Sequence, residues 1–186
     1  MRHRILAPSD FRRMPWRNGR GTTLELARVP ADGEAFDWRL SAADVASDGP
    51  FSLFPGRERV LVLLAGDGIE LSHGDGRTTR LARLFEQVRF SGDEPIVSRL
   101  LGGPIRDFNA IVDRGRFDLA VEVVRAGGPS AVIASPATLL VFAFDGAARV
   151  GAVEVPAGHL LHTELAAGPT IVASAGVALA VVLRER

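Results

Sequence analysis

The chain alternates apolar with polar or small residues at Phe36-Asp37-Trp38-Arg39-Leu40-Ser41, and again at Phe117-Asp118-Leu119-Ala120-Val121-Glu122-Val123. This period of two is typical of half-buried β-strands. Similar short segments follow at close spacing, each bounded by Gly, Pro or Asp, as in a β-sandwich or barrel. The sequence therefore predicts an all-β protein.

Very little helix is expected beside these strands. Ser9 can cap one short turn at residues 10–13, before Pro15, and residues 42–46 can form another. Neither turn is long enough to organise a fold.

A weak internal repeat relates the two halves of the chain. The pair Phe36-Asp37 returns as Phe117-Asp118, and Pro95-Ile96-Val97-Ser98 has a counterpart that begins at Pro169. Such matches are offset by about 74 to 81 residues, a drift that loop insertions would produce. We expect two similar β units in tandem, residues 1–112 and 113–186; chance matching of turn residues is the alternative.

The two expected units differ in chemistry. Where the first has Arg39 and Ser41 on one strand face, the second has Ala120 and Glu122. Residues 126–144 contain no charged side chain. A functional site is therefore expected in the first unit, with the second unit as support.

Composition excludes several classes of function. The 186-residue chain is 47% apolar and carries 22 basic and 22 acidic side chains, four His and no Cys. A formal net charge of zero leaves no positive excess for binding DNA or RNA. Without Cys there is no disulfide framework or thiolate nucleophile, and because every basic residue is Arg there is no lysine for Schiff-base chemistry.

The apolar runs of the sequence also predict neither a signal peptide nor a membrane span. The apolar run after Met1 stops at Pro8, which is too short for the hydrophobic region of a signal peptide. The longest apolar run, residues 171–183, contains Ser and Gly and is shorter than a membrane span. We therefore expect a cytoplasmic protein with no membrane partner.

Three of the expected strands each carry two hydrogen-bonding side chains on one face: Thr23 and Glu25, Arg39 and Ser41, Asp107 and Asn109. If these faces line the mouth of a barrel, Arg39, Arg59 or Arg106 can bind a carboxylate through two hydrogen bonds. Amide, hydroxyl and carboxyl groups can then recognise an amide, an amine or a ring nitrogen of the ligand; they belong to Asn18, Thr23, Glu25 and Asn109. The alternative is that the same faces are solvated and the apolar faces point inward.

The segment from Asp48 to Arg59 places two aromatic residues between turn formers. One interpretation is a rigid loop whose Phe51 and Phe54 cap an apolar edge of the pocket. The other is that both rings only plug the end of a barrel.

Neither a metal site nor a hydrolytic triad is expected. His159 and His162 lie three residues apart, so on a strand they would point to opposite faces, and no His-x-His occurs. No Ser lies in a nucleophile elbow. The sequence thus gives no catalytic residue, no metal ligand and no cofactor.

Four linked motifs resemble the HutD/Ves family, whose members are associated with bacterial histidine utilisation and have a bicupin fold. The motifs are Met14-Pro15-Trp16-Arg17-Asn18 with Gly21, Thr23 and Glu25; Trp38-Arg39-Leu40-Ser41; residues 48–56 with Arg59; and Gly103-Pro104-Ile105-Arg106-Asp107-Phe108-Asn109. The resemblance implies two cupin-like barrels in tandem. It also implies a ligand pocket lined by Asn18, Thr23, Glu25, Arg39, Ser41, Arg59, Asp107 and Asn109, with apolar walls from Trp16, Phe51 and Phe54.

The same resemblance implies a function. We expect a metal-independent binding protein that moderates histidine utilisation by binding a small anionic intermediate of the urocanate or formylglutamate class. A stretch like the second cupin motif, Pro156 to His162, has its His displaced by one position, and the first motif's His pair is absent.

Two alternatives remain open. One is a slow enzyme that uses Glu25 as general acid or base on such an intermediate. The other is a structural or partner-binding protein that uses the apolar second unit. The apolar carboxy-terminal strands leave room for a homodimer.

Overall fold

The computed structural model describes residues 3–16, 21–33, 35–128, 131–132, 136–165, 170–173 and 175–186. Within these ranges the chain is all β apart from one 3-10 turn, η1 (Pro8–Asp10), which confirms the expected fold class. No helix in the described part of the chain is long and apolar enough to cross a membrane.

The chain forms two compact units. The N-terminal unit comprises Arg12–Gly115, and the C-terminal unit comprises Met1–Phe11 together with Arg116–Arg186. The sequence placed residues 1–112 in one unit; the structure instead groups the first eleven residues with the C-terminal half. The reason is strand pairing, because β1 (His3–Leu6) pairs with β17 (Leu160–Leu165) in antiparallel fashion.

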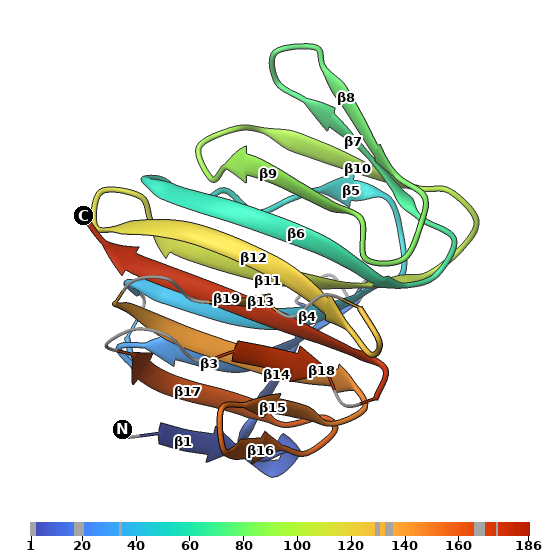
Figure 1. Ribbon diagram of the computed structural model, residues 1–186. Coiled ribbons are helices and arrows are strands. Elements are labelled where there is room, and N and C mark those ends of the chain that lie inside the picture. The colour runs from blue at the N-terminus through green and yellow to red at the C-terminus, as the bar shows by residue number, and fades with distance from the viewer. Residues whose placement is uncertain are drawn as a thin grey trace. The chain divides into compact units, whose positions relative to one another are not determined.

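The N-terminal unit is built from two antiparallel sheets (Figure 1). In its described residues, the larger sheet has the order β2 (Arg12–Pro15), β3 (Gly21–Val29), β4 (Trp38–Val45), β11 (Ile105–Asp113), β6 (Arg57–Ala65) and β9 (Gln87–Ser91). The smaller sheet has the order β5 (Gly49–Pro50), β10 (Ile96–Leu100), β7 (Ile69–His73) and β8 (Thr78–Leu81).

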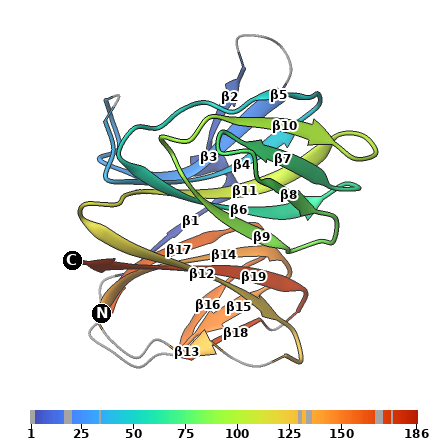
Figure 2. The same cartoon turned by 90° about the horizontal axis from the view of Figure 1, so that it is seen from above.

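The C-terminal unit is built in the same way (Figure 2). Its larger sheet has the order β1, β17, β14 (Ala137–Asp145), β19 (Val177–Glu185) and β12 (Phe117–Arg125). Its smaller sheet has the order β13 (Ala131–Val132), β18 (Thr170–Ala173), β15 (Ala148–Val150) and β16 (Val153–Val155).

The strand orders confirm the internal repeat. The order β4-β11-β6-β9 in one unit matches β12-β19-β14-β17 in the other, and β5-β10-β7-β8 matches β13-β18-β15-β16. Within the described residues, the β2–β3 hairpin is an addition to the N-terminal unit. It extends the larger sheet beyond β4.

Each unit encloses its own apolar core, formed by alternate residues of the strands. In the N-terminal unit the fully buried members include Leu61, Leu63, Ile69 and Leu71. In the C-terminal unit the core runs from β12 through β19 and includes Leu139, Val141, Leu161 and Ala180. Because alternate positions of each strand are buried, apolar residues recur in the sequence with a period of two.

Both expected helical turns were wrong. Residues 42–45 belong to β4, because β3 and β11 pair with that strand on its two sides. Near the N-terminus, η1 ends at Asp10, and Arg12 already belongs to β2. The cap is also different: the Asp10 carboxylate accepts the Ala7 backbone N–H at 2.8 Å, and Pro8 occupies the first helical position.

Leu71→Ala is expected to lower the free energy of unfolding by about 2–5 kcal/mol, since it leaves a cavity in a fully buried site. Urea denaturation followed by circular dichroism measures the change. The matched control is Leu84→Ala, at a side chain that is 50% exposed, which should change stability by no more than about 0.5 kcal/mol. Equal losses in the two variants would contradict the packing described here.

Candidate functional site

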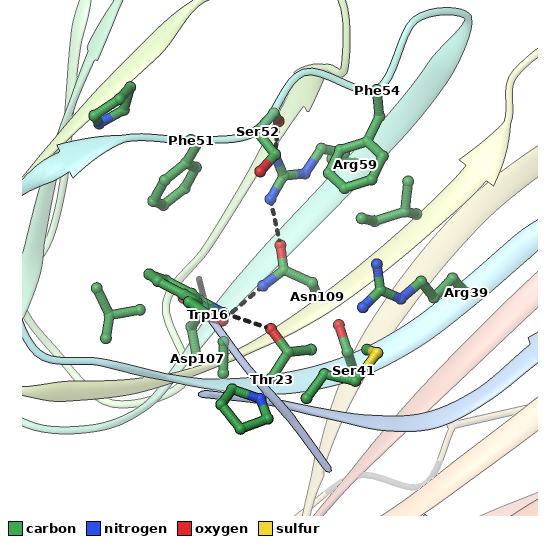
Figure 3. A pocket seen from close by; sticks show the side chains of 16 residues that line it. Trp16, Thr23, Arg39, Ser41, Phe51, Ser52, Phe54, Arg59, Asp107 and Asn109 are labelled. Carbon is green, nitrogen blue, oxygen red and sulfur yellow. Dashed lines mark hydrogen bonds between the residues drawn. The ribbon is translucent and has the colours of Figure 1, made fainter. Parts of the chain in front are cut away.

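A pocket of about 500 Å3 lies within the N-terminal unit (Figure 3). Strands β3, β4, β6 and β11 supply its polar side, and the segment after β5 supplies aromatic rings. The lining residues are Met14, Pro15, Trp16, Thr23, Arg39, Ser41, Ala43, Val45, Pro50, Phe51, Ser52, Phe54, Arg59, Asp107, Asn109 and Ile111. The polar strand faces therefore point inward, so the solvated-face alternative is wrong.

A chain of three buried polar side chains crosses the pocket wall. Arg59 on β6 donates from Nη2 to Asn109 Oδ1 at 2.8 Å, and Asn109 donates from Nδ2 to Asp107 Oδ1 at 2.6 Å. Asn109 and Asp107 are two residues apart on β11, so they share one face of the strand. None of the three side chains is more than 6% exposed.

Three phenylalanines surround the guanidinium of Arg59. The ring centroids of Phe51 and Phe54 each lie 5.3 Å from its Cζ, and that of Phe90 lies 4.8 Å away. Such cation–π contacts favour the charged form and hold the group in place. The backbone carbonyl of Ser52 accepts a further hydrogen bond from Nη1 at 3.3 Å.

Arg59 keeps unused hydrogen-bonding capacity. Its Nε is buried and has no hydrogen-bond partner among the described residues. Burial lowers the pKa of Arg59 to about 10 against the attraction of Asp107, so the side chain is cationic at neutral pH. Although three rings and two hydrogen bonds surround the guanidinium, Arg59 is one of the residues that line the pocket.

Asp107 is the carboxyl group inside this wall. Burial raises its pKa to about 7, although the charge of Arg59 and the hydrogen bond from Asn109 both lower it. Asp44, on the neighbouring strand β4, raises it further. Near neutral pH a substantial part of the protein therefore carries Asp107 as the uncharged acid.

Arg39 and Glu25 form a second charge pair. Arg39 Nε lies 2.9 Å from Glu25 Oε2, although the N–H does not point at that oxygen. Burial lowers the pKa of Arg39, while the attraction of Glu25 raises it. Arg39 lines the pocket, whereas Glu25, on β3, is not among the lining residues.

Trp16 is held over the pocket by the β2–β3 hairpin. Its indole Nε1 donates to Thr23 Oγ1 at 2.9 Å, and its backbone N–H donates to the carbonyl of Gly21 at 3.0 Å. A Cβ at position 21 would lie 2.8 Å from the indole and 2.5 Å from the carbonyl oxygen of Asp44. Only glycine lets the ring pack this closely against the strand.

The sequence-derived site residues come together in this one place, with three exceptions: Glu25, Asn18 and Arg106. Arg106 is not in the lining and pairs with Asp44 instead. Trp16, Thr23, Arg39, Ser41, Phe51, Phe54, Arg59, Asp107 and Asn109 all line the pocket. Glu25 reaches it only through Arg39. Asn18 falls at residues 17–20, outside the described part of the chain.

Other contributions were missed by sequence reasoning. Phe90 approaches Arg59 most closely of the three rings, and its alternation with Val88 on β9 was the signal available. Ser52 takes part through its backbone carbonyl, which no side-chain pattern reveals. The other apolar lining residues are Met14, Pro15, Ala43, Val45, Pro50 and Ile111.

The chain matches the model of the HutD family over residues 8–186. It is 40% identical over 140 residues to an uncharacterised 21.2 kDa protein in the hutC 3′ region of Pseudomonas putida, covering 75% of this chain and 72% of the relative. It is 39% identical over 118 residues to protein Ves of Citrobacter koseri, covering 61% of each chain.

Solved structures give the same result for the fold. The structure of HutD from Pseudomonas fluorescens SBW25 superposes with a TM-score of 0.85 at 29% identity and full coverage of both chains. The bacterial pirin YhhW of Escherichia coli, in complex with nickel(II), superposes with a TM-score of 0.71 at 8% identity, over 99% of each chain. These likenesses confirm the cupin-like, two-unit fold expected from the sequence.

A metal such as the pirin's nickel does not fit this pocket. Among the described residues, its charged lining consists of two guanidiniums and one carboxyl group with a raised pKa. Cations are repelled by such a set, whereas metal ligands are imidazoles, thiolates and ionised carboxylates. Over the described residues no group of three or more His, Asp or Glu side chains is placed to hold a metal ion.

Asp107→Asn is expected to change how stability depends on pH. Because the folded protein binds the Asp107 proton more tightly than the unfolded chain, with pKa about 7 against 3.8, this group stabilises the fold most at low pH. Its contribution falls as pH rises from about 4 to 7, by up to about 1.4 kcal/mol per pH unit. Urea denaturation of both proteins at intervals over this range measures the effect. The free energy of unfolding of the variant, relative to that of the wild type, should increase as pH rises. Parallel profiles would contradict the raised pKa.

Proposed function

Because the chain belongs to the HutD family, we propose that its pocket binds a small anionic intermediate of histidine utilisation, of the urocanate or formylglutamate class. Binding holds part of the intermediate and lowers its free concentration. The protein thereby moderates flux through the pathway or its induction. The relative encoded in the hutC 3′ region of Pseudomonas putida supports this link to histidine utilisation.

The observation that carries the proposal is the buried guanidinium of Arg59. A cation that is 6% exposed, with Nε lacking a partner in the described residues, attracts an anionic group. A carboxylate is the group that best matches the N–H edge of a guanidinium. Arg39, on the neighbouring side of the lining, adds a second positive charge.

The size and walls of the pocket suit a ligand of this class. A volume of about 500 Å3 lies within the range of small-molecule sites. Trp16, Phe51 and Phe54 present apolar surface, while Thr23 and Ser41 present hydroxyl groups. One end of the ligand would therefore meet charged and polar groups, and the rest would lie against aromatic rings.

If the protein is an enzyme, Asp107 replaces Glu25 as the candidate general acid or base. Glu25 is occupied by Arg39 and is not in the lining, so it is poorly placed as a general acid or base. Asp107 is the carboxyl group in the lining, and its pKa of about 7 suits proton transfer. NMR spectra of a bound ligand over long incubation would reveal turnover, which Asp107→Asn would abolish.

A thermal-shift screen tests the proposed function directly. The compounds are histidine, urocanate, imidazolone propionate, formiminoglutamate and N-formyl-L-glutamate. At about 100 times its dissociation constant a ligand adds about 2.7 kcal/mol, which corresponds to roughly 5–10 °C in Tm for a chain of this length. No shift with any of these compounds at millimolar concentration, together with stable oligomers, would favour the partner-binding alternative.

Arg59→Met is expected to abolish the shift, because it removes the buried charge and keeps much of the side-chain volume. Circular dichroism shows whether the variant is folded, and Arg39→Gln provides a second variant at the lining. The matched control is Arg99→Gln, which removes an exposed arginine that pairs with Glu70 outside the pocket. If both lining variants bound the ligand with wild-type affinity, the proposal that these arginines bind its anionic group would be wrong.

A further inference from the structure

The charged groups at the pocket are balanced in two unequal pairs. Arg39 lies 2.9 Å from the carboxylate of Glu25, so this pair is in direct contact. Arg59 and Asp107 are instead connected through the amide of Asn109, by hydrogen bonds of 2.8 and 2.6 Å. The Asp107 carboxylate therefore depends on a cation that it reaches through another side chain.

A ligand carboxylate disturbs the second pair. It would share the charge of Arg59 with Asp107, because Arg39 is already paired with Glu25. Two anions would then lie against one guanidinium in a largely buried wall. Like charges at short range disfavour ionisation, and burial already disfavours the ionised form of Asp107. Glu25 is protected from this effect because it has its own partner in Arg39.

Other charged groups around Asp107 do not stabilise its ionised form. Asp44 on β4 is negative and raises the pKa of Asp107, and its own ion pair is with Arg106, at 2.7 Å. The residues directly opposite Asp107 on the neighbouring strands are Ala43 and Leu63, which carry no charge. Taking up a proton is then the available way to restore neutrality.

We propose that the pocket binds its carboxylate ligand together with one proton, which resides on Asp107 and makes that side chain a hydrogen-bond donor to a neutral acceptor on the ligand. This inference rests on the proposed function, since it concerns the same pocket. The raised pKa of Asp107 in the free protein places it close to this state already.

The hydrogen bonds that Asn109 and Asp107 already make then indicate which class of ligand fits. Asn109 uses its carbonyl oxygen for Arg59 and its amide nitrogen for Asp107, so one end of it is committed to each partner. Asp107 Oδ1 accepts from Asn109, which leaves Oδ2 to carry the proton. The ligand should combine a carboxylate with a carbonyl or unprotonated ring nitrogen. A ligand with an ammonium group at that place would require the ionised carboxylate and should bind less well.

Isothermal titration calorimetry with N-formyl-L-glutamate at pH 7.5, in two buffers of different ionisation enthalpy, measures the proton uptake. Because about a quarter of Asp107 is already protonated at this pH when its pKa is about 7, we expect uptake of about half to three-quarters of a proton per ligand. The affinity should fall by up to about tenfold per pH unit above pH 7, since a proton is bound with the ligand. Neither carboxylate of this probe titrates in that range.

Asp107→Asn is the deciding variant, because its side chain is neutral at every pH and can still accept from Asn109. It should bind the probe with no proton uptake and with affinity independent of pH from 6.5 to 8.5. The control Asp75→Asn, at an exposed turn residue of the same unit, should keep the uptake of the wild type. Unchanged uptake in Asp107→Asn would overturn the proposal.

A matched pair of ligands tests the predicted class. L-glutamate differs from N-formyl-L-glutamate in having an ammonium group where the other has a neutral amide carbonyl. The wild type should bind the formylated compound at least tenfold more tightly, and equal or tighter binding of glutamate would contradict the proposal.

Acetate separates this inference from the proposed function. It is a simple carboxylate with no connection to histidine utilisation, and it is titrated at up to a few hundred millimolar. Proton uptake with acetate, but no binding of the pathway compounds, would support the inference and refute the proposed function. Binding of a pathway compound without uptake would do the reverse. If no carboxylate binds, both fail.

Discussion

A guanidinium inside a β-sheet unit needs hydrogen-bond partners and a counter-charge, because an unpaired buried cation costs several kcal/mol. Arg59 meets this need with the Asn109 amide, the Ser52 carbonyl and three phenylalanine rings. These partners come from three parts of the N-terminal unit. The loop after β5, the strand β11 and the edge strand β9 are thus all tied to one side chain. Arg59 thus helps to hold that loop, and with it the aromatic wall of the pocket, together with the backbone hydrogen bonds from Phe51 to Ile96 and from Phe54 to Gly92.

The repeat shows what the same strands do without this constraint. The registers of β6 with β11 and of β14 with β19 place Leu139, Ala178 and Ala180 in the C-terminal unit where the N-terminal unit has Arg59, Asp107 and Asn109. All three replacements are apolar and buried in the core. Two alanines and a leucine can pack together, whereas a hydrogen-bonded Arg-Asn-Asp chain cannot collapse onto apolar neighbours. The same fold is therefore a filled core in one unit and a pocket in the other.

Strand periodicity was enough to predict the fold class and the pairs of polar residues that share a face. Arg39 and Ser41, and Asp107 and Asn109, were grouped correctly because alternate residues of a strand necessarily point the same way. Periodicity could not decide which face is buried, since either face of an isolated strand can turn inward. The motifs shared with a known family supplied that choice.

Other features depended on contacts between distant strands. Glu25 shares its strand face with Thr23, but its carboxylate pairs with Arg39 and it is not among the lining residues. The short turn expected at residues 42–46 became part of β4 because strands pair with it on both sides. In both cases local propensity was weaker than pairing between segments that are far apart in sequence.

Asn109 gives the pocket a property that neither charged residue has alone. If Arg59 and Asp107 were in direct contact, each would satisfy the other and neither would respond strongly to a ligand. With an amide between them, the carboxyl interacts with the cation without touching it. Burial raises the pKa of Asp107 more than the charge of Arg59 and the hydrogen bond from Asn109 lower it. The amide also has a fixed orientation, since its oxygen accepts from Arg59 and its nitrogen donates to Asp107. A change at either end of the chain is thus transmitted to the other through two short hydrogen bonds.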